Sequence, residues 1–163
     1  LGGGVAPRGS VMGPMSEVVF RSTQHLSRAD LQAMAEFLKS LPRTPARVPA
    51  APAPDGATMR RGEAVYRDHC SACHGERGEG AGGLYPPLAG NRAVALARPN
   101  NVVKAIFHGG FAPATAANPR PFGMPPFAQV LSDAEVAAVS TYIRNAWGAA
   151  APAVTALDVL NVR

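Results

Sequence analysis

The two cysteines of the chain, Cys70 and Cys73, lie three positions apart and are followed directly by His74 in the stretch CSACH. This C-x-x-C-H arrangement is typical of covalent haem attachment, because two thiols on one helical turn can each bond a vinyl group while the imidazole faces the iron. A disulfide, a redox dithiol and half of a zinc site are the alternatives, but no second C-x-x-C and no βαβ pattern accompany the motif, and none of them explains the histidine. The motif therefore predicts one covalent haem c, with His74 as the proximal iron ligand.

The sixth iron ligand must come from elsewhere in the chain, and Met124 is the main candidate. It lies fifty positions after His74, in the stretch PFGMPPF. The flanking prolines would hold a loop rigid and present the thioether, a ligand that favours ferrous iron and raises the reduction potential. A core methionine is the alternative, but a proline-rich loop is a poor place for core packing. His108 is the rival ligand and would lower the potential, although its position before Gly109 and Gly110 suits a helix C-terminus better.

The proximal imidazole also needs a hydrogen-bond partner on its second nitrogen, which fixes the ring and tunes its basicity. In the stretch YPPLAGN, the carbonyl of Pro86 or of Pro87 could accept that bond, with Leu88 turned onto the haem face. A simple turn at the two prolines is the alternative interpretation. The sequence leaves both interpretations open.

The composition indicates a small protein core. There are 17 glycines and 16 prolines among 163 residues, and the aromatic side chains are one Trp, three Tyr and six Phe. Much of the chain must therefore be loop, and side chains alone can build only a small core. A large apolar macrocycle would help to fill it.

Charge and hydropathy exclude two classes of partner. The net charge of +5 comes from residues scattered without a basic run and with few aromatics among them, so we expect no nucleic-acid binding. The longest uncharged stretches, such as residues 148–157, are shorter than the roughly 20 residues that a bilayer requires, so we expect no transmembrane segment.

The chain starts at Leu1 without a signal-peptide pattern, and we expect that processing or truncation removed its original start.

Prolines divide the chain into two parts. Residues 42–54 contain five of them, and proline fixes φ and favours an extended segment. We therefore place a linker at 42–57, between a leading segment at 1–41 and a domain at 58–148. Residues 149–163 are expected to form a C-terminal tail.

Three helices are expected after the linker, and no credible strand. Apolar spacing predicts a helix over 59–69 that runs into the cysteines. A second is expected over 102–107, with Asn100 or Asn101 as its cap. The third begins at Ser132, where Glu135 completes a capping box. The sequence therefore predicts an all-α fold.

The leading segment repeats the end of the chain. The alignment keeps a constant offset of 105 residues, as these pairs show: Ser27 with Ser132, Leu31 with Val136, Met34 with Val139, and Leu38 with Ile143. An offset of this length suits a small domain, so the leading segment is expected to be the remnant of an earlier copy. Its apolar stripe predicts that residues 16–41 are helical only through packing, either on the domain at 58–148 or across a dimer.

The pattern GEAVYRDHCSACHGERGEG, followed by YPPLAGN, FGMPPF and a terminal aromatic helix, resembles a class I c-type cytochrome domain over residues 58–148. The resemblance implies a class I cytochrome c fold, with three or more helices wrapped around one covalent haem. It implies that the first and last helices cross, with Gly62 allowing close approach near Tyr142. It also carries the two thioethers and the two axial ligands onto the residues named above.

The leading stretch GPMSEVVFRSTQHLSRADLQAMAEFLKSLP resembles the end of the middle haem domain in three-haem cytochrome subunits of membrane-bound bacterial alcohol, sugar and gluconate dehydrogenases. The resemblance implies that Met15 is the axial ligand of that neighbouring haem, whose own C-x-x-C-H lies upstream. Met15 is expected to end near solvent or a foreign surface.

Together the resemblances imply an electron-transfer subunit rather than an enzyme. Electrons would pass from a dehydrogenase catalytic subunit through upstream haem domains and leave toward a quinone or another redox acceptor of the respiratory chain. The location would be periplasmic, on the outer face of the bacterial inner membrane, with membrane association through the full complex. An independent soluble periplasmic shuttle is the first alternative, and a haem peroxidase or gas sensor, which needs an open sixth position, is the second.

Overall fold

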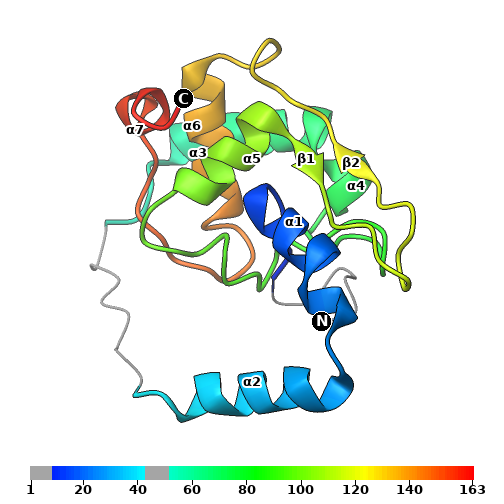
Figure 1. The fold of residues 1–163 in the computed structure, drawn as a ribbon. Helices are drawn as coiled ribbons and strands as arrows, with labels where there is room; N and C mark the ends of the chain where they lie inside the picture. Colours follow the sequence, from blue (N-terminus) through cyan, green and yellow to red (C-terminus); the bar gives the residue numbers. More distant parts are fainter. Residues whose placement is uncertain (1–8, 43–51) are drawn as a thin grey trace.

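The computed structural model describes residues 9–42 and 52–163, so most of the predicted linker at 42–57 lies outside the described residues. Within these ranges the elements are helical except for one two-stranded sheet, in agreement with the predicted all-α fold class (Figure 1). The elements are α1 (Pro14–Arg21), the 3-10 helix η1 (Thr23–His25), α2 (Arg28–Ser40), α3 (Gly56–His69), α4 (Ser71–His74), α5 (Asn100–His108), β1 (Gly110–Phe111), β2 (Gly123–Met124), α6 (Asp133–Ile143) and α7 (Ala156–Leu160).

Two of the predicted helix starts were placed too late. The side chain of Asp55 accepts hydrogen bonds from the backbone of Ala57 and Thr58, so α3 begins at Gly56 and takes the last two residues of the predicted linker. Helix α5 begins at Asn100 after Pro99, so neither candidate asparagine caps it. Pro99 cannot donate from its own backbone, which makes the first turn a suitable place for it.

The third predicted helix start is confirmed at α6. The Ser132 side chain accepts from the backbone N–H of Glu135, and the Glu135 carboxylate accepts from the backbone N–H of Ser132 at 2.8 Å. This capping box satisfies donors that the first helical turn leaves free.

Helices α3 and α6 cross in close contact at Gly62, as the resemblance implied. A Cβ atom at Gly62 would collide with the backbone carbonyl of Ala138 and would lie 2.6 Å from Cβ of Tyr142. Only glycine lets the two backbones approach this closely. The crossing fixes the direction in which α3 delivers the chain to Cys70.

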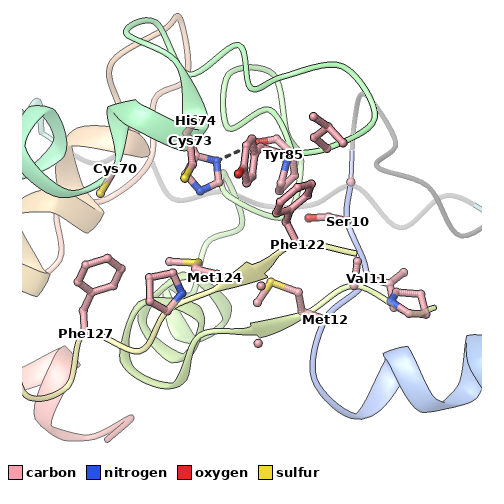
Figure 2. A pocket seen from close by; sticks show the side chains of 18 of the residues that line it. Ser10, Val11, Met12, Cys70, Cys73, His74, Tyr85, Phe122, Met124 and Phe127 are labelled. Atoms are coloured by element: carbon pink, nitrogen blue, oxygen red, sulfur yellow. Dashed lines mark hydrogen bonds between the residues drawn. The ribbon is translucent and has the colours of Figure 1, made fainter. Parts of the chain in front are cut away.

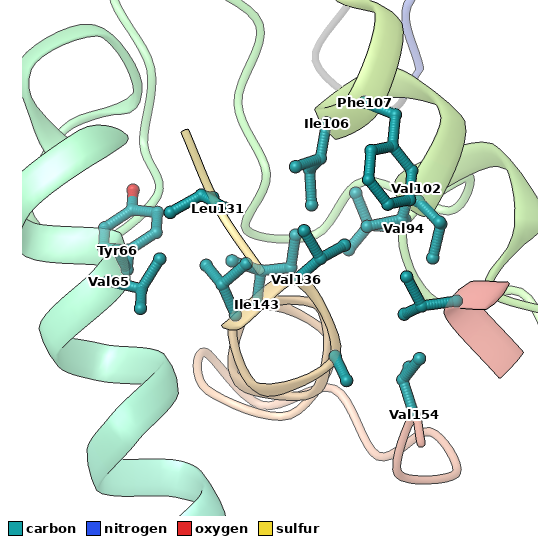
Figure 3. Packing of buried hydrophobic residues seen from close by; sticks show 14 residues of the cluster. Val65, Tyr66, Val94, Val102, Ile106, Phe107, Leu131, Val136, Ile143 and Val154 are labelled. Atoms are coloured by element: carbon teal, nitrogen blue, oxygen red, sulfur yellow. The ribbon is translucent and has the colours of Figure 1, made fainter. Parts of the chain in front are cut away.

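The hydrophobic core lies on both sides of α6. In Figure 3, Val136 and Ile143 of α6 lie between Val65 and Tyr66 of α3 on one side and the side chains of α5 on the other. The segment at 149–163, expected to be a tail, adds to this core because its Val154 and Val159 side chains are buried. Helix α7 packs against α6, and the backbone N–H of Val154 donates to the Thr141 hydroxyl at 2.8 Å.

A buried arginine joins two loop segments to the end of α6. Arg144 is fully buried, and its guanidinium donates to the carbonyls of Val94, Leu96, Ala97 and Pro152. Hydrogen bonds to a charged group are stronger than neutral ones, so this contact stabilises the loop before α5 against the C-terminal segment.

The expectation of no strands is wrong at one place. β1 pairs antiparallel with β2, with Gly110 opposite Met124 and Phe111 opposite Gly123. Two-residue strands show no alternation of apolar and polar residues, so a periodic pattern cannot reveal them. The pairing holds the loop that carries Met124 against the end of α5.

Helix α2 lies apart along one edge of the molecule (Figure 1). Its cap repeats that of α6, since the Ser27 side chain accepts from the backbone N–H of Asp30. No residue of α2 is buried, and Met34 and Leu38 are 46% and 63% exposed, so the domain at 58–148 does not cover its apolar stripe. Across the described ranges, no helix combines the length and the apolar character needed to cross a bilayer.

Candidate haem-binding site

A cavity of about 550 Å³ opens beside α4 (Figure 2). This volume falls within the range of about 300–1,000 Å³ that is common for ligand sites. Both cysteines and His74 line it, and so do Leu84 to Pro86, the segment around Met124, and residues of the leading segment. The walls are mostly apolar, as a site for a porphyrin ring requires.

The CSACH motif forms a single helical turn. Cys70 ends α3, and its carbonyl accepts from the backbone N–H of Cys73 at 3.2 Å and of His74 at 2.9 Å. Gly75 ends the turn with φ 79°, a conformation that favours glycine. Both thiols are free. Burial is the main cause that raises the pKa of Cys70 to about 11, and the neighbouring Cys73 adds to the shift. The Cys70 sulfur is therefore a neutral thiol beside an apolar cavity.

The imidazole of His74 is oriented by a backbone carbonyl. Nδ1 lies 2.9 Å from the carbonyl oxygen of Pro86, and burial lowers the pKa of His74 while this hydrogen bond opposes the shift. With Nδ1 protonated and donating, Nε2 carries the lone pair that an iron ligand needs. Of the two predicted acceptors, Pro86 makes the contact, whereas the Pro87 carbonyl accepts from the Asn91 side chain at 3.1 Å.

Leu88 does not face the cavity, contrary to the expectation from YPPLAGN. Its backbone N–H donates to the carbonyl of Gly78 at 2.8 Å, which turns the segment back toward the core. The Leu88 side chain packs against that core and lines a separate, smaller cavity together with Trp147. Leu84 and Tyr85 line the large cavity on this side instead.

Met124 enters the same cavity from β2. In Figure 2, the side chains of His74 and Met124 point into the cavity from α4 and from β2. The strand pair fixes Met124 on one side, and on the other the backbone N–H of Phe127 donates to the carbonyl of Ile106 at 2.9 Å. The rival His108 is exposed and is not among the residues that line the cavity.

Several aromatic wall residues were not predicted. Phe122 and Phe127 flank Met124 in PFGMPPF, and Tyr85 packs against Phe122 with tilted rings whose centroids lie 5.4 Å apart. Their adjacency to the candidate ligand was a usable signal. Residues Gly9 to Met12 and Val19 also line the cavity, and nothing in the sequence marked them. Met15 does not line it and is 57% exposed, as expected.

The arrangement fits a covalently bound haem c. Two free thiols, an imidazole with its second nitrogen occupied and a thioether all reach one apolar cavity. The zinc alternative would need further ligands beside the cysteines, and nowhere in residues 9–42 and 52–163 do three His, Cys, Asp or Glu side chains gather to hold a metal ion.

Comparisons with known proteins point the same way. Residues 59–147 match the family model described as cytochrome c. The chain is 37% identical over 164 residues to the cytochrome c subunit of alcohol dehydrogenase (quinone) from Gluconobacter oxydans (strain 621H), a match that covers 94% of this chain and 34% of that protein. It is 35% identical over 164 residues to the gluconate 2-dehydrogenase cytochrome c subunit of Pantoea cypripedii, covering 94% of this chain and 37% of that protein.

A shorter match relates the chain to cytochrome c-552 of Thermus thermophilus. The identity is 36% over 91 residues, which covers 53% of this chain and 68% of that protein. By contrast, the chain spans about a third of the length of the two dehydrogenase subunits that it matches.

Proposed function

Because the chain belongs to the cytochrome c family, we propose that it relays single electrons through one haem c held by Cys70, Cys73, His74 and Met124. The resemblance to c-type cytochromes seen in the sequence is confirmed by this membership. The observation that carries the proposal is the meeting of the CSACH turn and Met124 in one apolar cavity.

The ligand set favours electron transfer over catalysis. When bound, haem c supplies a reversible one-electron change at its iron. His74 and Met124 would both hold the iron, and with both ligands in place no site would be left open for a substrate, a peroxide or a gas. The apolar walls, with Phe122 and Phe127 among them, would exclude water from a bound haem and so favour its less charged ferrous state.

The relay belongs, in this proposal, to a dehydrogenase complex. The matches to the alcohol and gluconate dehydrogenase subunits cover 94% of this chain, so they take in most of the leading segment as well as the domain at 59–147. Electrons would arrive from a dehydrogenase catalytic subunit by way of upstream haem domains. They would leave toward a quinone or another redox acceptor.

The domain organisation is part of the same proposal. Residues 1–41 would end a preceding haem domain, because α2 repeats the cap and apolar stripe of α6 at a constant offset. The uncovered stripe of α2 would then pack within that preceding domain. The protein would be periplasmic, on the outer face of the bacterial inner membrane, and would reach the membrane through the full complex.

Carbon monoxide addition and a redox titration of the haem-loaded chain test the proposal. We expect a one-electron titration curve and no carbon monoxide binding to the ferrous protein, since the thioether of Met124 fills the sixth position. Met124→Ala should bind carbon monoxide and so shows that the assay can detect an open site. Rapid binding by the unmodified chain would point instead to a peroxidase or gas sensor.

A further inference from the structure

The leading segment supplies one wall of the haem cavity. Residues Ser10 to Met12 and Val19 line it, although they precede the cysteines by more than fifty positions. In Figure 2, Met12 projects into the cavity below Met124. The site that was assigned to the domain at 58–148 is therefore completed by residues outside that domain.

Two contacts and one buried side chain hold this segment in place. The Ser16 hydroxyl donates to the carbonyl of Phe111 at 3.0 Å, and Val19 is only 7% exposed. Met12 packs on Gly110 so closely that a Cβ atom there would lie 3.1 Å from Cε of Met12. Gly110 is the residue opposite Met124 in the β1–β2 pair, so Met12 abuts the strand pair that carries the candidate axial ligand.

From these contacts we propose that Met12 is a positioning residue of the haem site, which closes the cavity beside Met124 and raises the potential of the iron by excluding water. A flexible apolar thioether suits an irregular gap of this kind. The apolar shell around a redox site controls solvent access and local dielectric, and through them the potential. The potential of this haem thus depends on the segment that precedes its domain. The inference rests on the proposed function.

The test compares four variants of the haem-loaded full chain, with the midpoint potential and the long-wavelength band of methionine-ligated ferric haem as readouts. Met12→Ala should keep the band and lower the potential, by up to a roughly tenfold change in the equilibrium constant for reduction, or ~59 mV for one electron. Met12→Leu restores an apolar side chain of similar size and should titrate like the unmodified chain.

Two further variants separate closure from general damage. Ser16→Ala removes the hydroxyl that ties the segment to Phe111 and should lower the potential in the same direction, less than Met12→Ala does. Met15→Ala, three positions from Met12 but 57% exposed, should leave the potential unchanged.

Several results would overturn the inference. One is an unchanged potential in Met12→Ala. Another is an equal drop in Met12→Leu, which would mean that the sulfur matters rather than the closure of the cavity. The third is loss of the band in Met12→Ala, which would make Met12 itself a ligand. Failure of the proposed function looks different, because the unmodified chain would then show no one-electron couple or would bind carbon monoxide.

Discussion

Tyr66 donates a 2.6 Å hydrogen bond from its hydroxyl to the carbonyl of Gly75, the residue that directly follows His74. Tyr66 lies on α3 and is 2% exposed, and its ring packs against Tyr142 and Trp147 with centroid distances of 5.6 and 5.2 Å. One side chain thus joins the end of the CSACH turn to the aromatic contacts between α3 and α6.

Tyr66→Phe should destabilise the protein by about 1 kcal/mol, because the aromatic contacts remain while the Gly75 carbonyl loses its donor. Thermal unfolding of the haem-loaded chain measures the effect as a lower Tm. Tyr142→Phe is the matched control from the same aromatic cluster and should cost less, since Tyr142 is only half-buried. Equal losses in the two variants would contradict a special role for the bond to Gly75.

The same hydroxyl predicts a loss of stability at high pH. Burial raises the pKa of Tyr66 well above its ordinary value of 10.0. A raised pKa in the folded state contributes stability that is complete below pH 10 and declines as the pH rises toward the folded value. Chemical unfolding measured at pH 8 to 11 should therefore show a steeper decline in the unmodified chain than in Tyr66→Phe; parallel curves would count against this assignment.

Gly62→Ala should be costly because its new methyl group meets the Ala138 carbonyl and the Tyr142 side chain. Overpacking of this kind costs about 1–3 kcal/mol, and the crossing of α3 and α6 would have to open. Gly56→Ala, on the first turn of the same helix, meets only the mobile end of the Arg60 side chain at 3.3 Å and should change stability by less than roughly 0.5 kcal/mol. Urea titration of both variants checks the contrast.

Met124→Ala should abolish the long-wavelength band of methionine-ligated ferric haem and lower the midpoint potential, because a soft sulfur ligand stabilises ferrous iron. Met15→Ala should change neither property, since its side chain is exposed and lies outside the cavity. Absorption spectra of the two ferric variants show which methionine is the iron ligand. Loss of the band in Met15→Ala alone would assign the ligand to Met15 instead of Met124.

One covalent haem per chain is expected, because the sequence holds a single C-x-x-C-H although two methionines stand in axial-type positions. Pyridine haemochrome absorbance divided by protein concentration gives the ratio. A value of two would require a haem at Met15 with its histidine from another source. Cys73→Ser provides the control, since it removes one of the two thioethers.

Local signals in the sequence were sufficient for the centre of the site. The spacing in CSACH predicts a turn that brings both thiols and the imidazole to one side, and the Ser132 and Glu135 pair predicts where α6 starts. Each of these features depends on neighbours within about four positions. These short stretches of sequence are therefore sufficient to predict the turn and the helix start.

Contacts between distant segments could not be predicted in the same way. Arg144 donates to carbonyls about fifty positions earlier, and Met12 reaches a cavity that residues from His69 to Phe127 line, 57 to 115 positions later. Leu88 turned away from the cavity because of two backbone hydrogen bonds to Gly78 that no pattern of side chains encodes. The apolar stripe of α2 predicted a helix correctly, but the expected packing on the domain at 58–148 is not seen, because no residue of α2 is buried.

The acceptor that orients His74 is a main-chain carbonyl, so neither a substitution at its position nor a change of pH removes it. A carbonyl oxygen is present whatever residue occupies position 86, so drift at that position can change the turn but cannot delete the acceptor. It also never takes up a proton at ordinary pH, unlike the carboxylate that serves the same purpose beside many metal-bound histidines. Acidification of the surrounding medium therefore does not remove the hydrogen bond that orients the imidazole, so this contact does not make the driving force of the relay depend on pH.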